Sequence, residues 1–285
     1  MSTDQLQRGM THGVAVRYLF VDLLETARTA VIRHGLDPRA ARMCAEGMLA
    51  GALMSGHIKG DERLTVQLQA ENPQASLLCD IHANGSLRAR FRPQSYGHLS
   101  PEAISGMLLV IKHNRKKELY RGISAIENES IESALRRYLM KSEQIDSALR
   151  LIVEQDDSGN LTSAFGVVLE RLPPAPDLPE ISTADFYTKY KAIASLTAMD
   201  LISEMQSGEL LGHDLHPLQS KRLKWECNCS MSRIEGMLKS LGQDELEQII
   251  KEDGRAEVVC DYCNTSYALE LPDLNRLLND LLQIC

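Results

Sequence analysis

Hydrophobic and polar positions alternate along much of the stretch between residues 63 and 171. In Arg63 to Ala70 (RLTVQLQA), three apolar residues alternate with Thr and Gln, which is the period of a half-buried strand. Similar short runs follow: ASLLCDIH, SLRARFRP, GMLLVIKH, LYRGISAI, LRLIVEQ and SAFGVVLERL. Turn residues separate two pairs of these runs, at Asn84-Gly85 and at Asp157-Ser158-Gly159. The pattern predicts a mainly antiparallel sheet.

A helical period precedes and interrupts these strands. We predict two helices within residues 17–58, the second opened by Asp37 as N-cap and Pro38 at its first position. The first of them rests on the spacing of Val21, Leu24, Ala27 and Ile32. Glu129 to Gln144 predicts a third helix, with its apolar residues on one face. Helices grouped around an antiparallel sheet make an α+β domain.

A proline-rich stretch, Leu172 to Pro179 (LPPAPDLP), should end this domain, because proline continues neither a helix nor a strand ladder. Beyond it, apolar residues recur every three or four positions and predict an amphipathic helix with a buried face. That face consists of Phe186, Tyr190, Ile193, Leu196, Met199, Ile202 and Met205. We therefore expect three parts: an α+β core domain at 1–176, a helical linker at 177–224 and a small C-terminal module at 225–285.

Composition and charge narrow the classes of function. The chain has 285 residues and a formal net charge of −8, which argues against nucleic acid as a main partner. We interpret the basic run Lys112 to Lys117 (KHNRKK) as a solvated turn. The sequence shows no run of 18 apolar residues and no signal-peptide pattern, so we expect a cytoplasmic protein without membrane contact. It also contains no phosphate-binding G-x-x-x-x-G-K-[ST] motif, so no use of ATP is expected.

Four of the seven cysteines form two tight pairs near the end of the chain. Cys227 and Cys229 make a C-x-C pair, and Cys260 and Cys263 follow as C-x-x-C after thirty intervening residues. Cytosolic thiols stay reduced, and two close pairs of thiolates suit tetrahedral zinc. Asn264 suits the left-handed backbone conformation needed just after such a turn. We predict one zinc ion held by these four cysteines.

Residues around the pairs predict a small α/β module. RAEVVC and TSYALE should be strands around the second pair, and a helix should start at Pro272. Between the pairs, Ser232 and Glu235 could form a capping box, and Ile234, Leu238, Leu241, Leu246, Ile249 and Ile250 give two short apolar faces. So little core implies that metal helps the module to fold.

The zinc is not expected to be catalytic. Four cysteines close its coordination shell, whereas a catalytic zinc keeps one position open for water, so we predict no enzymatic activity. The HDLH stretch, His213 to His216, is interpreted as a surface turn outside the cluster. Cys44 and Cys79 are expected to be core thiols, and Cys285 is terminal.

Spacing alone leaves a purely structural zinc site open, but the chemistry of thiolates also allows a redox switch. Oxidation of both pairs to disulfides would remove every zinc ligand. Structural zinc contributes about 10–16 kcal/mol of apparent binding energy. A disulfide that closes a ~15-residue loop contributes roughly 3 kcal/mol, and these tighter rings should contribute less. Oxidation should therefore unfold the module.

These residues resemble the 33-kDa redox-regulated heat-shock chaperones. The cysteine pattern, with EDGRAEVVCDYC leading into the second pair, is similar to their zinc switch. LTVQLQ and YRGISAIENESIESALRRYLMKSEQ are similar to their first domain, so the resemblance covers nearly the whole chain. Two turns depart from the family, which tends to carry glycine where this chain has Ala70 to Pro73 (AENP) and Glu127-Asn128.

The resemblance implies a chaperone that is inactive when reduced and zinc-bound. Oxidation would pair Cys227 with Cys229 and Cys260 with Cys263, release the zinc and loosen the linker. The activated protein, as a homodimer, would then hold unfolding client proteins without ATP. Two other functions compete with this one: an adaptor with a constitutive zinc ribbon for a fixed protein partner, and a thiol oxidoreductase using Cys260 and Cys263. The oxidoreductase lacks the thioredoxin-like βαβ pattern that it would need.

Overall fold

The computed structural model describes residues 4–96, 103–174 and 178–282 and divides the chain into two compact units. The first unit comprises residues 1–226 and the second comprises residues 227–285. The expected linker at 177–224 falls within the first unit, where it shares a hydrophobic cluster with a sheet. The proline-rich stretch and Cys285 include positions that lie outside the described residues.

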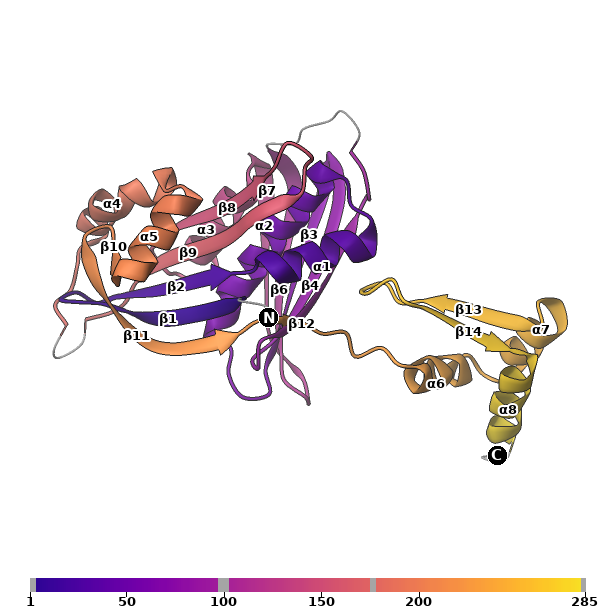
Figure 1. Ribbon diagram of the computed structural model, residues 1–285. Coiled ribbons are helices and arrows are strands. Elements are labelled where there is room, and N and C mark those ends of the chain that lie inside the picture. The colour runs from indigo at the N-terminus through magenta and orange to yellow at the C-terminus, as the bar shows by residue number, and fades with distance from the viewer. Residues whose placement is uncertain (1–3, 97–102, 175–177, 283–285) are drawn as a thin grey trace. The chain divides into compact units, whose positions relative to one another are not determined.

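The first unit contains two six-stranded sheets, and the first of them is antiparallel throughout (Figure 1). In spatial order its strands are β10 (Glu209–Leu210), β11 (His213–Arg222), β1 (Gln5–Thr11), β2 (Val16–Asp22), β9 (Leu161–Arg171) and β8 (Ser147–Gln155). Strand β2 corrects the expectation that residues 17–58 form two helices, since the chain is extended up to Asp22. Tyr18 packs into one hydrophobic cluster and Leu19 into another, so β2 is buried on both faces. A strand of this kind is apolar throughout and is easily mistaken for part of a buried helix.

The second sheet consists of the strands that alternation predicted, with one addition. In spatial order they are β12 (Lys224–Trp225), β5 (Ser86–Arg92), β4 (Gln74–His82), β3 (Arg63–Asn72), β6 (Ile104–His113) and β7 (Glu118–Glu129). Pairing is antiparallel except between β12 and β5, which run parallel. Leu64, Val66 and Leu68 face the core, as their alternation predicts. The basic run after β6 forms the turn into β7, where Asn114 N–H and Lys117 C=O are bonded at 3.0 Å.

The buried helix α2 (Pro38–Met54) lies between the two sheets and joins them into one core (Figure 1). The helices of this layer are α1 (Leu24–His34), α2 (Pro38–Met54), the 3₁₀ turn η1 (Ser55–His57) and α3 (Ile131–Lys141). The predicted N-cap of α2 is confirmed, because the Asp37 carboxylate accepts the Ala40 N–H at 2.8 Å. A Cβ at Gly47 would lie 2.1 Å from Leu77 Cδ2 of β4, so glycine allows α2 to approach the sheet closely. Ile32, assigned to the buried face of the first helix, is 79% exposed.

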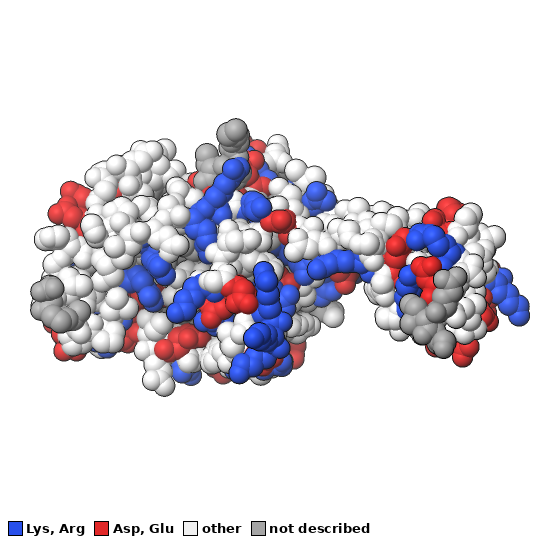
Figure 2. All heavy atoms as spheres, turned by 90° about the horizontal axis from the view of Figure 1, so that it is seen from below, with Lys and Arg blue, Asp and Glu red and all other residues white. Residues whose placement is uncertain are grey.

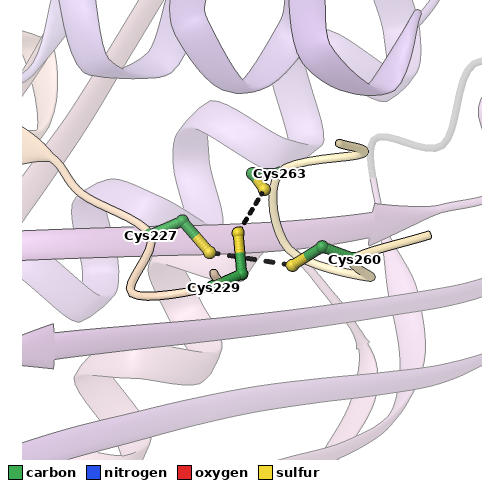
Figure 3. A group of neighbouring side chains, drawn as sticks. All are labelled: Cys227, Cys229, Cys260 and Cys263. Atoms are coloured by element: carbon green, nitrogen blue, oxygen red, sulfur yellow. Dashed lines mark hydrogen bonds between the residues drawn. The ribbon is translucent and has the colours of Figure 1, made fainter. Parts of the chain in front are cut away.

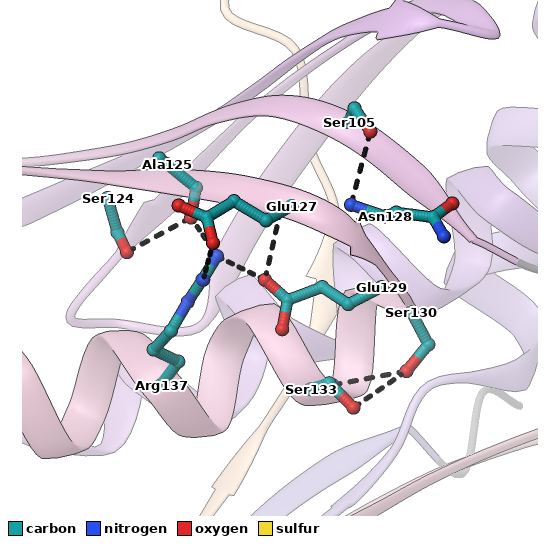
Figure 4. Close-up of polar contacts among 9 residues, drawn as sticks. All are labelled: Ser105, Ser124, Ala125, Glu127, Asn128, Glu129, Ser130, Ser133 and Arg137. Atoms are coloured by element: carbon teal, nitrogen blue, oxygen red, sulfur yellow. Dashed lines mark hydrogen bonds and ion pairs between the residues drawn. The ribbon is translucent and has the colours of Figure 1, made fainter.

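The turn from β7 into α3 carries one of the departures from the family pattern (Figure 4). Asn128 has a φ of 52°, the left-handed region that asparagine adopts more readily than other side chains do. Its N–H donates to Ser105 Oγ at 3.1 Å, and Ser130 caps α3. The Arg137 guanidinium fixes the turn by donating to Ala125 C=O and to the Glu129 carboxylate. Asn128 therefore adopts a left-handed conformation of the kind that glycine also favours.

The prediction of one continuous amphipathic helix in the linker is wrong, because the helix is interrupted. The segment consists of α4 (Thr183–Tyr190), the 3₁₀ turn η2 (Lys191–Ser195) and α5 (Ala198–Ser207). The break has a local cause, because Thr197 is extended and forms a capping box with Asp200 that starts a new helix.

Because α5 starts as a new helix, its buried face is not a continuation of the buried face of α4. This changes which residues of the linker are buried. Phe186, Tyr190, Ile193 and Leu196 are buried as expected, in one cluster with Tyr18 and Val167 of the first sheet. Ile202 and Met205 pack against this cluster and are partly buried. Met199, however, is 75% exposed, and Leu201 occupies the buried position instead.

The second unit is a small module of three helices and a hairpin. Its elements are α6 (Met231–Leu241), α7 (Gln243–Glu252), β13 (Arg255–Val259), β14 (Ser266–Glu270) and α8 (Leu271–Leu282). The two predicted strands pair antiparallel, in agreement with the sequence. The cap of α6 is Ser230 rather than the expected Ser232, and Glu235 pairs with Arg276 of α8 at 2.6 Å.

Candidate metal centre

The four paired cysteines come from two segments of the second unit. Cys227 and Cys229 lie in the extended chain before α6, and Cys260 and Cys263 lie in the turn between β13 and β14 (Figure 3). Two backbone hydrogen bonds close that turn: Cys260 N–H donates to Thr265 C=O at 2.9 Å, and Asn264 N–H donates to Cys260 C=O at 2.8 Å. Asn264 has a φ of 56°, which confirms the left-handed conformation predicted for it.

The sulfur positions fit a tetrahedral metal. Cys227 Sγ lies 3.7 Å from Cys260 Sγ, and Cys229 Sγ lies 3.2 Å from Cys263 Sγ. All four sulfurs lie within 4.8 Å of one another and converge on one point (Figure 3). Ideal Zn–S bonds of ~2.3 Å place tetrahedral ligands roughly 3.8 Å apart, close to the Cys227–Cys260 separation and longer than the Cys229–Cys263 one. Within residues 4–96, 103–174 and 178–282, this is the one group of three or more Cys, His, Asp or Glu side chains close enough to share an ion.

Hydrogen bonds around the sulfurs form an outer layer that sequence reasoning missed. The Tyr267 hydroxyl donates to Cys229 Sγ at 3.0 Å, and the backbone N–H groups of Tyr262 and Cys263 donate to Cys260 Sγ. Such donors stabilise negative charge on a ligand and hold it in place. The sequence held one signal for this contact. Tyr267 lies two residues before Leu269 on the same strand, so both side chains lie on the inward face.

The thiols differ in how readily they ionise. Burial raises the pKa of Cys263, but contacts with Thr265 and Cys229 outweigh it and lower that pKa to about 6. Burial raises the pKa of Cys229 to about 12, in spite of the Tyr267 hydroxyl. Metal binding and oxidation both require thiolate, so Cys263 is better prepared for either reaction than Cys229 or Cys260, whose pKa values are raised.

The remaining residues singled out from the sequence lie elsewhere. Cys44 and Cys79 are fully buried in the first unit, where burial raises the pKa of Cys44 to about 12, so both behave as core thiols. His213 and His216 are not in a turn, because they belong to strand β11, which pairs with β1. The His213 ring packs against Tyr190 of the linker with centroids 5.4 Å apart. No described helix combines the length and the apolar character needed to span a membrane.

Comparison with known proteins gives one consistent result. The family model described as Hsp33 protein matches residues 4–270. The 33 kDa chaperonins of Staphylococcus aureus strains JH9 and Newman are each 28% identical over 292 residues, covering 99% of this chain and all of theirs. A crystal structure of the 33 kDa chaperonin (heat shock protein 33 homolog) from Thermotoga maritima shares the fold, with a TM-score of 0.84 at 21% identity and coverage of 99% and 100%. The fold, the match along nearly the whole chain and the cysteine cluster lead to one conclusion: the chain belongs to the Hsp33 family.

Proposed function

We propose that this chain is an ATP-independent chaperone that holds unfolding proteins and is switched on by oxidation. Its family and the names of its relatives support a chaperone that binds unfolded clients and has no enzymatic role. The redox control is carried by one observation. The four sulfurs that fit a metal are also the four whose oxidation would dissolve the site.

The second unit has little besides this centre to hold it together. Its hydrophobic cluster contains six buried side chains: Ile234, Leu238, Leu246, Leu269, Leu274 and Leu277. In the reduced protein, Cys227, Cys229, Cys260 and Cys263 would hold one zinc ion, which supplies a cross-link between the chain before α6 and the β13–β14 turn. Structural zinc contributes about 10–16 kcal/mol, more than so small a core can replace.

Oxidation would remove that cross-link. Each pair of thiols loses two electrons and two protons as one S–S bond forms, and one hydrogen peroxide is reduced to two waters. We propose the pairs Cys227–Cys229 and Cys260–Cys263, which bond neighbours in sequence and leave the two segments unconnected. The contacts of 3.7 Å between the Cys227 and Cys260 sulfurs and 3.2 Å between the Cys229 and Cys263 sulfurs join the two segments, as expected of shared metal ligands.

The linker supplies the surface that activation would expose. Its buried side chains and the outer face of the first sheet form one apolar cluster with Phe186 and Tyr190 at its centre. If the linker leaves the sheet, both apolar faces reach solvent, and such patches bind non-native chains. We propose that the activated form is a homodimer and that the protein works in the cytoplasm. The six described cysteines are all free thiols, as a reducing compartment requires.

Light scattering by a thermally unfolding client tests the proposal. Peroxide-treated protein should suppress aggregation at a roughly equimolar ratio, while reduced, zinc-loaded protein should not. Cys44→Ala serves as the control, because that thiol is buried in the first unit and should leave activation by peroxide unchanged. Equal activity of the reduced and oxidised proteins would contradict control by oxidation but would leave the proposed chaperone activity standing.

A further inference from the structure

One end of the second sheet carries a row of basic side chains that the chaperone function does not use. Arg63 on β3 is paired in register with His82 on β4 and with His113 on β6. Side chains directly opposite each other on neighbouring strands lie on the same face, with Cβ atoms about 5 Å apart. The three therefore form a continuous row across three strands.

These residues line a pocket. Its volume is about 450 Å³. Three segments bound it: residues 60–63, which lead into β3, residues 82–84, which end β4 and turn towards β5, and residues 113–115, which end β6 and turn towards β7. Arg115 adds a fourth basic side chain to its wall. Figure 2, which views the molecule from below, shows Lys and Arg side chains gathered on this end of the first unit.

A second, smaller pocket adjoins the first. It has a volume of about 150 Å³, shares Gly60 and Ala83 with the larger pocket and is lined by Arg8, Lys59 and Lys221. The Lys221 ammonium is its innermost charge, since its Nζ lies 3.5 Å from the carbonyl of Ser55. We refer to these two adjoining pockets together as the basic channel, in a chain whose net charge is −8.

Arg63 is the feature that indicates a ligand. Its side chain is half-buried, and its Nε is shielded from solvent without a hydrogen-bond partner among the described residues. An unsatisfied buried donor costs about 1–3 kcal/mol, and more when the group is charged. A guanidinium is recognised well by an oxyanion, which accepts two of its N–H groups at once.

The nearby acids are hydrogen-bonded or paired mainly with residues outside this row, although the charge of Asp80 also acts on Arg63 and His82. Asp80 accepts from Thr65 Oγ1 at 2.6 Å and pairs with Arg88 at 2.9 Å. Glu62 pairs with Lys112 at 3.1 Å and accepts the Lys59 N–H. The carboxylate of Asp61 is exposed at the rim. The Arg63 guanidinium forms no ion pair within hydrogen-bond distance among the described residues, although its charge helps to lower the pKa of Asp80, and its Nε is left for a ligand.

We propose that this channel binds phosphate, as inorganic phosphate or as a short inorganic chain of phosphates. One tetrahedral oxyanion fits the larger pocket, with Arg63 donating to two oxygens and His82, His113 and Arg115 around it. The smaller pocket then accommodates a second or third phosphate beside Arg8 and Lys221. Nucleic acid is disfavoured, because neither pocket is lined by the Phe, Tyr or Trp rings on which bases stack most strongly.

Calorimetric titration of the reduced, full-length protein at constant ionic strength tests this proposal, with inorganic phosphate and tripolyphosphate as the probes. We expect saturable binding at one site, tighter for tripolyphosphate. Arg63→Gln should weaken the binding at least tenfold. Arg136→Gln removes the same charge from an exposed position on α3 with no hydrogen bond, and it should leave the affinity unchanged.

Three results would overturn the proposal. The first is unchanged affinity in folded Arg63→Gln, or in His113→Gln if the arginine variant does not fold. The second is an equal loss in Arg136→Gln, which would indicate only a general effect of charge. The third is tighter binding of a dT15 oligonucleotide than of tripolyphosphate, lost in the same variant, which would assign the channel to nucleic acid. None of these outcomes depends on chaperone activity or on zinc.

Discussion

The two units of this protein are stabilised in different ways. The first unit buries side chains from two sheets and the helix between them in one cluster, and the linker adds a second cluster on the outer face of the first sheet. The second unit has six buried apolar side chains and four cysteines. Apolar burial is sufficient for the first unit, whereas we propose that the second also needs metal–sulfur bonds, which a change of redox state can break.

Charge adds to this difference. Residues 227–285 contain 11 Asp and Glu but only 5 Lys and Arg, which gives the small module most of the net negative charge of the chain. Like charges on a compact chain repel one another and favour its expansion. Without metal, the module must therefore be held against self-repulsion by very few apolar contacts.

Of the changes predicted here, removal of the metal should affect the difference in stability between the two units most strongly. A zinc chelator, or the double change Cys260→Ser with Cys263→Ser, should abolish amide protection across residues 227–282 while β3, β4 and α2 keep theirs. Hydrogen exchange followed by mass spectrometry measures both regions in one sample, and metal analysis should give one zinc per chain before treatment. Retained protection in α6 to α8 after complete zinc loss would show that the module folds on its own core.

Linker docking should respond next most strongly, and two leucine-sized side chains of α5 form a matched pair for testing it. Leu201 is fully buried against the first sheet, whereas Met199 on the same helix is 75% exposed. Leu201→Asp places a carboxylate in an apolar cluster, so we expect the linker to be released and cut faster by protease. Met199→Asp should behave like the unchanged protein.

Leu201→Asp also tests the link from the linker to chaperone activity. We expect the reduced variant to suppress client aggregation without oxidant while it retains its zinc. A released linker with no chaperone activity would separate linker release from activation and assign client binding to another surface.

The same two units show what the sequence could reveal. The strands of the second sheet alternate cleanly because only one of their faces is buried, so Leu64 and its neighbours were predicted correctly. The cysteine cluster was equally predictable, because Cys227, Cys229, Cys260 and Cys263 lie in pairs set by local chain geometry. Both signals are contained within a few consecutive residues.

Features that depend on distant contacts were missed. Strand β2 loses its alternation because the linker covers one face and α2 the other, so it resembled a helix. Strand β11 is polar and exposed, and it is a strand because it pairs with β1 about two hundred residues away. The break at Thr197 depends on one capping box, which shifts the helical phase and exchanges Met199 for Leu201. None of these three features can be predicted from the hydrophobic period of a short stretch of sequence.

A smaller effect is expected from the hydrogen bond between Tyr267 and Cys229. Tyr267→Phe removes the hydroxyl that lies 3.0 Å from the sulfur but keeps the ring in place. Loss of a bond of this kind typically weakens metal affinity about 10–100-fold. Competition with a chromophoric chelator measures the change, and the first unit should unfold at the same denaturant concentration as before. Unchanged zinc affinity would mean that the hydroxyl does not support the ligand.

The smallest effect should come from Glu46, and its sign distinguishes the two units. Burial on α2, opposed by Arg42 and reinforced by Glu132, raises the pKa of Glu46 from 4.5 to about 7. Between these two values the folded state holds a proton that the unfolded state has released. This group therefore makes the first unit less stable as the pH rises through that window. Zinc binding has the opposite dependence, because thiolate ligands compete with protons and the metal is held more tightly as the pH rises.

Glu46→Gln isolates that contribution. At pH 8 the variant should be more stable than the unchanged protein by up to about 1 kcal/mol, after allowance for partial exposure to solvent, and the gain should shrink towards pH 5. Urea unfolding can be followed by the fluorescence of Trp225, the single tryptophan, which packs against the core of the first unit. Glu71→Gln, at an exposed position of β3, is the matched control and should show no gain. Zinc affinity should be the same in all three proteins, because the carboxylate belongs to the unit that folds without metal. A variant that is less stable at pH 8 would mean that Glu46 is ionised there and held by Arg42, which would reverse the sign of its contribution.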